Sequence, residues 1–175
     1  SRTADGPSDT KTSSRGIGAE IARTLAGAGA KVIVNYTVNR KAAEAVCAAI
    51  TEAGGESLAV RADVSHSVEA RILFDAAIGR FNRVDILVNN AGVLLSRKIA
   101  DITDDEFDRV LSVNIKGVFY SLREAATRIA DGGRVVSMSS TVTRLMLANY
   151  GAYAASKGAV EQLTRVFARE VGKRG

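Results

Sequence analysis

The sequence predicts an α/β fold, a parallel sheet with helices on both faces, on three observations. Strand-like runs alternate with helix-like segments along most of the 175 residues. Parallel pairing is favoured because a helix-length crossover separates each strand from the next. The length itself suits one domain around a hydrophobic core. We expect strands at residues 31–36, 57–62, 84–88 and 134–139.

Five helices are expected, each from apolar residues that recur at helical spacing. Gly27 ends the first helix and Gly54 follows the second, as glycine is common where a helix ends. Thr103 and Glu106 form a capping box at the start of the longest, because the hydroxyl and the carboxylate each satisfy an unpaired backbone N–H group. The expected helices span residues 16–27, 40–53, 68–81, 104–128 and 152–171.

Composition excludes several functional classes. One cysteine cannot build an internal disulfide framework, and one histidine argues against a histidine metal centre or Ser-His-Asp catalysis. The net charge is +5, but the basic residues are scattered among acidic ones, so we favour a solvated surface over a nucleic-acid partner. No apolar run approaches the roughly 18–20 residues that span a bilayer, and no leader-like segment opens the chain. We therefore expect a cytoplasmic, metal-free protein with no membrane partner.

Two motifs carry chemistry. Gly16 and Gly18 open the first helix, where backbone N–H groups and the helix dipole would stabilise a pyrophosphate; an ordinary turn is the alternative. Tyr153 and Lys157 are four residues apart and share one helix face. A nearby ammonium favours the phenolate, so Tyr153 would be a proton donor to a carbonyl oxygen. A packed tyrosine beside a solvated lysine is the alternative.

The positions of two further polar residues, Ser140 and Asn114, indicate candidate roles in the site. Ser140 follows the fourth predicted strand, at the strand end where ligands bind in parallel sheets, and would hydrogen-bond a substrate oxygen unless it is a turn serine. Asn114 interrupts an apolar stretch of the longest predicted helix. A buried amide must be hydrogen-bonded, so Asn114 is either structural or part of a polar relay.

Together these residues resemble the short-chain dehydrogenase/reductase family over residues 13–175. The order and spacing of the motifs carry the resemblance. They are SSRGIG at 13–18, ADV at 62–64, NNAG at 89–92, SVNIKG at 112–117, SS at 139–140 and YxxxK at 153–157. The resemblance implies a Rossmann-like, doubly wound fold and NAD(P)-dependent oxidation of alcohols or reduction of carbonyls.

The resemblance also implies catalytic roles. Tyr153 would be the general acid or base, and Lys157 would lower the pKa of its phenol and hold the nicotinamide ribose. Ser140 would orient the substrate carbonyl, and Asn114 would hold a water molecule in a proton relay. The implied cofactor-binding set is Arg15, Gly16, Ile17, Gly18, Tyr36, Arg40, Asp63, Val64, Asn90, Ala91 and Gly92, with Tyr153 and Lys157.

The charge of the residues at the end of the family's second strand predicts which cofactor is bound. In this chain that strand is the one expected at residues 31–36. An acidic residue there would bond the ribose 2′-hydroxyl of NAD and repel a 2′-phosphate. Residues 35–40 contain no acid, and Arg15 and Arg40 flank the region. Two guanidinium groups would clamp a 2′-phosphate, so we expect NADP(H) over NAD(H).

The chain departs from the family pattern in three places. Thr12 stands where the family's glycine motif has its first glycine, and no strand precedes it in residues 1–12, which read as an irregular or disordered segment. The family's first strand would lie at the centre of the sheet, between its second and fourth strands. The family also continues through two more strands beyond the position of Gly175. Residues 13–175 are thus expected to form a partial dinucleotide-binding and catalytic domain.

The leading interpretation is an NADPH-dependent reductase of ketones, with a 3-oxoacyl thioester as the first substrate guess. We favour an active enzyme because the four catalytic positions are intact. A catalytically inactive cofactor-binding or scaffold protein is the alternative, motivated by Thr12 and the missing segments. The resemblance implies a homodimer or homotetramer, assembled through helices at about 104–129 and 152–172.

Overall fold

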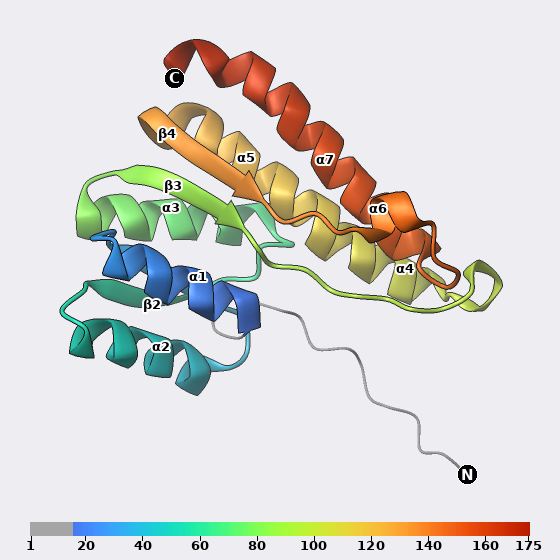
Figure 1. Cartoon of the computed structure of the whole chain (residues 1–175), viewed down its shortest axis with the longest axis horizontal. Helices are drawn as coiled ribbons and strands as arrows, with labels where there is room; N and C mark the ends of the chain where they lie inside the picture. Colours follow the sequence, from blue (N-terminus) through green and yellow to red (C-terminus); the bar gives the residue numbers. More distant parts are fainter. Residues whose placement is uncertain (1–15) are drawn as a thin grey trace.

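The computed structural model describes residues 16–175, so the segment expected to be irregular at residues 1–12 lies outside it. Helices and strands alternate as predicted (Figure 1). The strands are β1 Val32–Tyr36, β2 Ser57–Arg61, β3 Val84–Asn89 and β4 Ile129–Ser137. The helices are α1 Gly16–Gly27, α2 Arg40–Glu52, α3 Ser67–Phe81, α4 Asp104–Leu111, α5 Gly117–Arg128, α6 Val142–Leu145 and α7 Gly151–Val171. Short helical turns add η1 Ile99–Asp101, η2 Ser112–Lys116 and η3 Gly172–Arg174.

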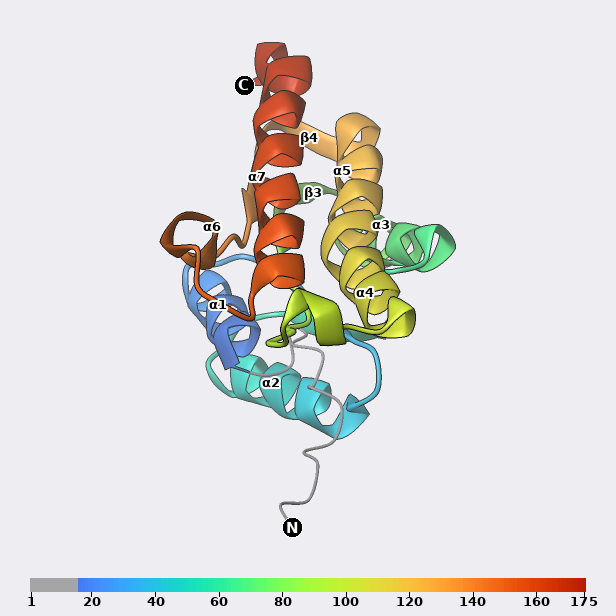
Figure 2. The ribbon, with the colours of Figure 1, turned by 90° about the vertical axis from the view of Figure 1, so that its right-hand side faces the viewer.

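The strands form two parallel pairs. β1 pairs with β2, and β3 pairs with β4, while no pairing joins β1 to β3 in the part of the chain that the structure describes. Helices α1 and α2 lie on one side of the strands and α3 and α5 on the other (Figure 2). The parallel α/β architecture is therefore confirmed, and the division into two pairs agrees with the expectation that the central first strand is missing.

Each strand pair has its own buried core. The core beside β1 joins α1, β1 and α2 through small and β-branched side chains, including Ala22, Val34 and Ile50. The core beside β4 joins α3, α5, β4 and α7 through larger side chains, including Leu122, Val160 and Phe167. Burial of this apolar surface stabilises both halves, and α3 contacts β1 as well as β3.

An apolar groove of about 440 Å³ runs between β1 and β3. Helices α1 and α3 line it, with Leu25 on one side and Phe74 on the other, and β3 contributes Leu87. The family's central strand would occupy this position. Asn90 also lines the groove, and its Nδ2 atom is buried with no hydrogen-bond partner among residues 16–175.

The longest predicted helix is not continuous. It divides into α4, the π-helical turn η2 and α5, which corrects the prediction of one helix over residues 104–128. The capping box of Thr103 and Glu106 is confirmed at the start of α4. The π turn arises where the Asn114 side chain bonds to distant parts of the chain. Such insertions often lie at functional sites, but hydrophobic periodicity does not reveal them.

Strand β4 begins earlier than predicted because its first residues bulge. The pairing register with β3 shifts between Val84 and Ile86, and Gly133 lies at this irregularity. A Cβ atom on Gly133 would lie 2.8 Å from the Ala130 carbonyl oxygen and 2.9 Å from that of Asp85. The backbones approach each other so closely here that only glycine fits.

Replacing Gly133 by alanine is therefore expected to destabilise the fold by about 1–3 kcal/mol, because the added methyl group forces the strands apart. Urea unfolding followed by circular dichroism measures this loss. Gly79→Ala is the matched control, because Gly79 lies inside α3 with nothing within 4 Å of its Cβ position. That control should gain about 0.5–1 kcal/mol. Equal stability of the two variants would contradict the tight approach at Gly133.

Candidate active site

Tyr153 and Lys157 lie together on α7, one helical turn apart. The Lys157 Nζ atom is 5.9 Å from the centre of the Tyr153 ring. Lys157 is 5% exposed, and its Nζ donates a 2.7 Å hydrogen bond to the Met138 carbonyl oxygen. Burial lowers the pKa of Lys157 below its ordinary value. The lysine is therefore not the solvated side chain of the alternative interpretation.

Asn114 connects the loop after β3 to α7. Its Oδ1 accepts a 2.8 Å bond from the Val93 N–H, and its Nδ2 donates to the Val93 carbonyl and the Ser156 hydroxyl, each at 2.9 Å. The Ser156 hydroxyl donates in turn to the Tyr153 carbonyl at 2.7 Å. Asn114 is completely buried, and both of its amide hydrogens are used. The side chain thus has a structural role, and sequence reasoning had missed Ser156.

Ser140 lies on the loop between β4 and α6. Its carbonyl accepts a 2.9 Å bond from the Thr143 hydroxyl, and the Val142 N–H lies 3.4 Å from its Oγ. This loop approaches α7 at Met138, which Lys157 contacts. The half-buried Ser140 is therefore on a segment that is held against the helix carrying Tyr153 and Lys157.

The residues after β3 reach the same region. A Cβ atom on Gly92 would lie 3.3 Å from Asn114 Oδ1 and 3.6 Å from Lys157 Nζ, so a side chain there would fill the space beside the lysine. Asn89 lies at the end of β3 and donates to the Ser137 hydroxyl at 3.3 Å. Asn90 and Ala91 lie between Asn89 and Gly92. The structure thus brings Gly92, Asn114 and Lys157 together.

The start of α1 has the features expected of a phosphate-binding turn. Gly16 has φ of +55°, a conformation that favours glycine. Ile17 is 58% exposed, whereas Gly18 is buried in the helix. The first N–H groups of a helix have no intrahelical partners and favour anions. Arg15 and Thr12 lie outside the described residues.

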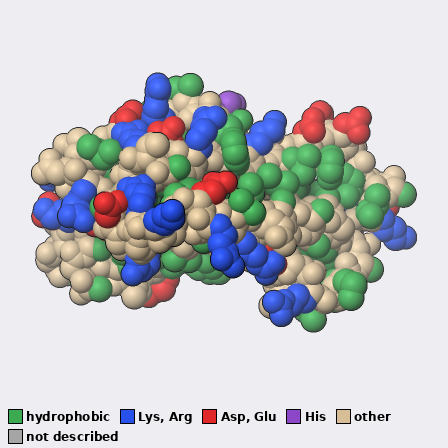
Figure 3. All heavy atoms as spheres, turned by 90° about the horizontal axis from the view of Figure 1, so that it is seen from above, with side chains coloured by type: hydrophobic (Ala, Val, Ile, Leu, Met, Phe, Trp, Pro, Cys, Tyr) green, Lys and Arg blue, Asp and Glu red, His purple; other side chains and the backbone are tan. Residues whose placement is uncertain are grey.

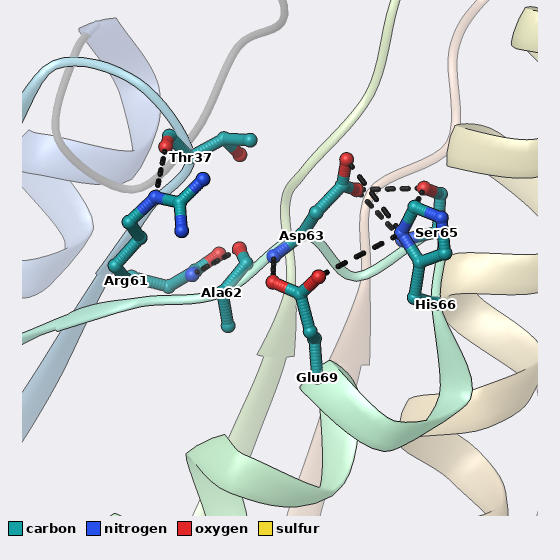
Figure 4. Close-up of polar contacts among 8 residues, drawn as sticks. Thr37, Arg61, Ala62, Asp63, Ser65, His66 and Glu69 are labelled. Atoms are coloured by element: carbon teal, nitrogen blue, oxygen red, sulfur yellow. Dashed lines mark hydrogen bonds and ion pairs between the residues drawn. The ribbon is translucent and has the colours of Figure 1, made fainter.

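The ends of β1 and β2 form a second polar region. Tyr36 is buried at the end of β1, and Arg40 begins α2, where its Nε donates to Glu44 at 2.7 Å. Arg61 at the end of β2 donates from Nε to the Thr37 carbonyl at 3.2 Å (Figure 4). Arg61 was not among the predicted cofactor residues. The pairing of β1 with β2 places Arg61 opposite Tyr36, so it is a cation at the end of these strands.

Asp63 is held by a polar network shown in Figure 4. Its backbone N–H donates to Glu69 Oε2 at 2.7 Å, and its carboxylate accepts from the Ser65 hydroxyl, also at 2.7 Å. His66 Nδ1 lies 3.9 Å from both the Asp63 and the Glu69 carboxylates. The next residue, Val64, lies against α5, where its Cγ2 would be 3.0 Å from a Cβ on Gly117. This network fixes the backbone at the expected adenine position.

A model of the short chain dehydrogenase family matches residues 12–175. The chain belongs to this family. An uncharacterized oxidoreductase of Methylorubrum extorquens is 42% identical over 161 residues, covering 92% of this chain and 65% of that protein. A short-chain type dehydrogenase/reductase of Picea abies is 42% identical over 168 residues, covering 90% and 62%. The chain thus spans a little under two thirds of these short-chain dehydrogenase relatives.

Solved structures of short-chain dehydrogenases have the same fold. One from Burkholderia cenocepacia, in complex with NADP, superposes with a TM-score of 0.89 at 40% identity, covering 93% of this chain and 66% of that one. An angucycline C-6 ketoreductase with bound NADP has a TM-score of 0.88 at 37% identity, covering 93% and 65%. The Rossmann-like architecture expected from the motifs is therefore confirmed.

Two negative findings apply to residues 16–175. Within this range, no helix has the length and apolar character needed to cross a bilayer. The same range has no group of three or more histidine, cysteine, aspartate or glutamate side chains arranged to hold a metal ion.

Proposed function

We propose that the protein containing this chain reduces a ketone to a secondary alcohol with NADPH, and that Tyr153 is its general acid. The observation that supports this most is the buried ammonium of Lys157, 5.9 Å from the centre of the Tyr153 ring. The cofactor's part of the chemistry is hydride donation to the carbonyl carbon. Gly92 leaves open the space beside Lys157, and Gly16 has the glycine-favouring turn that a pyrophosphate needs.

Each of the other residues has a defined part in this proposal. Tyr153 gives its phenolic proton to the carbonyl oxygen, and the Lys157 side chain lies beside the ring as it does so. Ser140 donates a hydrogen bond to that same oxygen and orients it. Asn114 fixes the loop after β3 against α7, and a relay water would bond to its remaining oxygen lone pair or its backbone. Alignment of the reacting groups supplies a large part of the rate acceleration.

The direct test is NADPH oxidation, followed by absorbance, with 3-oxoacyl thioesters and a panel of simple ketones. Turnover with any of them supports reduction. Tight NADPH binding without turnover across the panel would favour the alternative, a cofactor-binding or scaffold protein. The groove between β1 and β3 is the structural reason to keep that alternative, because the unpaired strands border the predicted cofactor region.

NADP(H) is the proposed cofactor, over NAD(H). No acidic residue lies in residues 35–40, and Arg40 and Arg61 both lie at this strand end. Arg15 would add a third cation. Bound NADP in the Burkholderia dehydrogenase and in the angucycline ketoreductase supports the same choice.

Replacing Arg40 by alanine is expected to weaken NADPH binding about 10-fold and to leave NADH binding nearly unchanged, because only NADPH carries the 2′-phosphate. Fluorescence titration with each cofactor measures both dissociation constants. Glu44→Gln is the control, since it removes the carboxylate that now pairs with Arg40 and should preserve or tighten NADPH binding. An equal loss for both cofactors would contradict a 2′-phosphate clamp.

The surface supports part of the substrate and assembly proposals. Figure 3 shows charged side chains of both signs spread over one face. Leu145, Met146 and Leu147 follow Ser140 and are exposed, which suits an apolar substrate such as a 3-oxoacyl thioester.

Phe107 on α4 and Phe119 on α5 are 42% and 45% exposed, which suits assembly into a homodimer or homotetramer through these helices and α7. We also propose a cytoplasmic location.

A further inference from the structure

The loop that carries Ser140 is attached to α7 at both ends by one carboxylate. Glu161 Oε1 accepts a 2.6 Å hydrogen bond from the Ser139 hydroxyl and a 2.9 Å bond from the Thr143 hydroxyl. Ser139 precedes Ser140, and Thr143 lies in α6 just beyond it. Thr143 also contacts the Ser140 carbonyl through the same hydroxyl, at 2.9 Å. The carboxylate therefore restrains the backbone on either side of Ser140.

Glu161 lies one helical turn after Lys157, so two opposite charges on the same face of α7 hold this loop. The Lys157 ammonium contacts the Met138 carbonyl, and the Glu161 carboxylate contacts the two hydroxyls. Because these contacts come from the helix that carries Tyr153, they fix Ser140 relative to the phenol. The Glu161 side chain is 26% exposed, and its Oε1 atom accepts from two hydroxyl groups of this one loop.

The charge of Glu161 is maintained by its surroundings. Hydrogen bonds from Ser139 and Thr143 lower its pKa below the ordinary value, and Arg165 and Arg144 act in the same direction. The Arg165 Nη2 atom lies 3.6 Å from Oε2, on the side of the carboxylate away from the loop contacts. A group with a lowered pKa favours the folded arrangement above its ordinary pKa and loses that contribution as pH falls through the lowered value. Glu161 is thus ionised at neutral pH.

We propose that Glu161 is a positioning residue, which sets the place of Ser140 relative to Tyr153 by holding residues 139–143 against α7. This inference rests on the proposed reductase function. Glu161 itself does not contact the substrate in this proposal. It acts through the loop, and a displacement of about 1 Å of a substrate-orienting group lowers turnover by up to about 100-fold.

Glu161→Ala is the main test, read out in two ways on the same protein. Hydrogen exchange of the backbone amides of residues 141–145 is expected to accelerate about 10-fold, because α6 loses its attachment to α7. The kcat for ketone reduction should fall by about 10- to 100-fold, while the dissociation constant for NADPH stays within about twofold. Glu161→Gln keeps an oxygen acceptor at the same place and should recover most of both properties.

Arg165→Ala is the matched control, because it removes a charged partner of Glu161 without touching the loop. Its exchange and kinetics should equal those of the unmodified protein. Unchanged exchange or unchanged kcat in Glu161→Ala would overturn the positioning role, as would a Glu161→Gln variant as impaired as alanine. Absence of turnover in the unmodified protein would instead refute the reductase function, and the exchange rates would then decide whether Glu161 holds the loop.

Discussion

Tyr153→Phe is expected to lower kcat for ketone reduction by about 10²- to 10⁴-fold, the range that a positioned general acid contributes. The variant loses one oxygen atom and keeps the ring, so the fold and the dissociation constant for NADPH should be preserved. Stopped-flow measurement of NADPH oxidation at saturating substrate gives the chemical step. The size of the loss follows from the proposed role of the phenol as the proton donor, at its place beside the buried Lys157.

The matched control is Tyr150→Phe. Tyr150 contacts Tyr153 edge to face, with ring centres 6.5 Å apart, and it precedes the first turn of α7. Four residues further along, however, is Ala154 and not a lysine, so the Tyr150 phenol has no equivalent neighbour on the helix. It should keep kcat within about threefold of the unmodified protein, because phenylalanine keeps the ring that packs against Tyr153. Similar rates for Tyr153→Phe and Tyr150→Phe would remove Tyr153 from the mechanism.

Asn114→Leu is expected to have the largest effect on stability, a loss of about 2–5 kcal/mol. The substitution keeps the number and branching of the side-chain heavy atoms but removes both partners of the Val93 backbone. Each unsatisfied buried group costs about 1–3 kcal/mol. Ser156 loses its donor as well. Urea unfolding followed by circular dichroism measures the change. A lower unfolding midpoint with an unchanged m-value reports the loss of stability.

Ser121→Ala is the control for this substitution. Ser121 is also buried, but within residues 16–175 its hydroxyl bonds only to the Gly117 carbonyl of its own helix, at 2.9 Å. Its loss should cost about 1 kcal/mol or less, because both groups belong to one helical segment. Equal unfolding midpoints for Asn114→Leu and the unmodified protein would show that the amide does not join the β3 loop to α7.

Local patterns were sufficient to predict most of the elements. Alternation of short apolar runs with amphipathic segments placed all four strands, and the capping box placed the start of α4. The spacing of Tyr153 and Lys157 also put them on one face of a helix, which the structure confirms. These features follow from the spacing at which side chains return to the same face of a strand or a helix. A stretch of a few residues is enough to display that spacing.

The family resemblance predicted that the central strand is missing, but it did not predict the groove. Composition indicated one core, whereas the described residues have two, one on each side of an apolar groove lined by α1 and α3. In the described residues no strand pairs β1 with β3, and α3 contacts a strand of each pair, β1 and β3. No local pattern in β1 or β3 reports whether a third strand lies between them.

The sequence alone determined the types and order of the elements, the shared helix face of the proposed catalytic pair and the family to which the chain belongs. Tertiary structure decided how those residues are held. Asn114 meets Val93 and Ser156, which are 21 and 42 positions away, and Glu161 meets Ser139 across 22 positions. Such contacts depend on how helices and loops pack in three dimensions, and the periodicity of a single element contains no information about them.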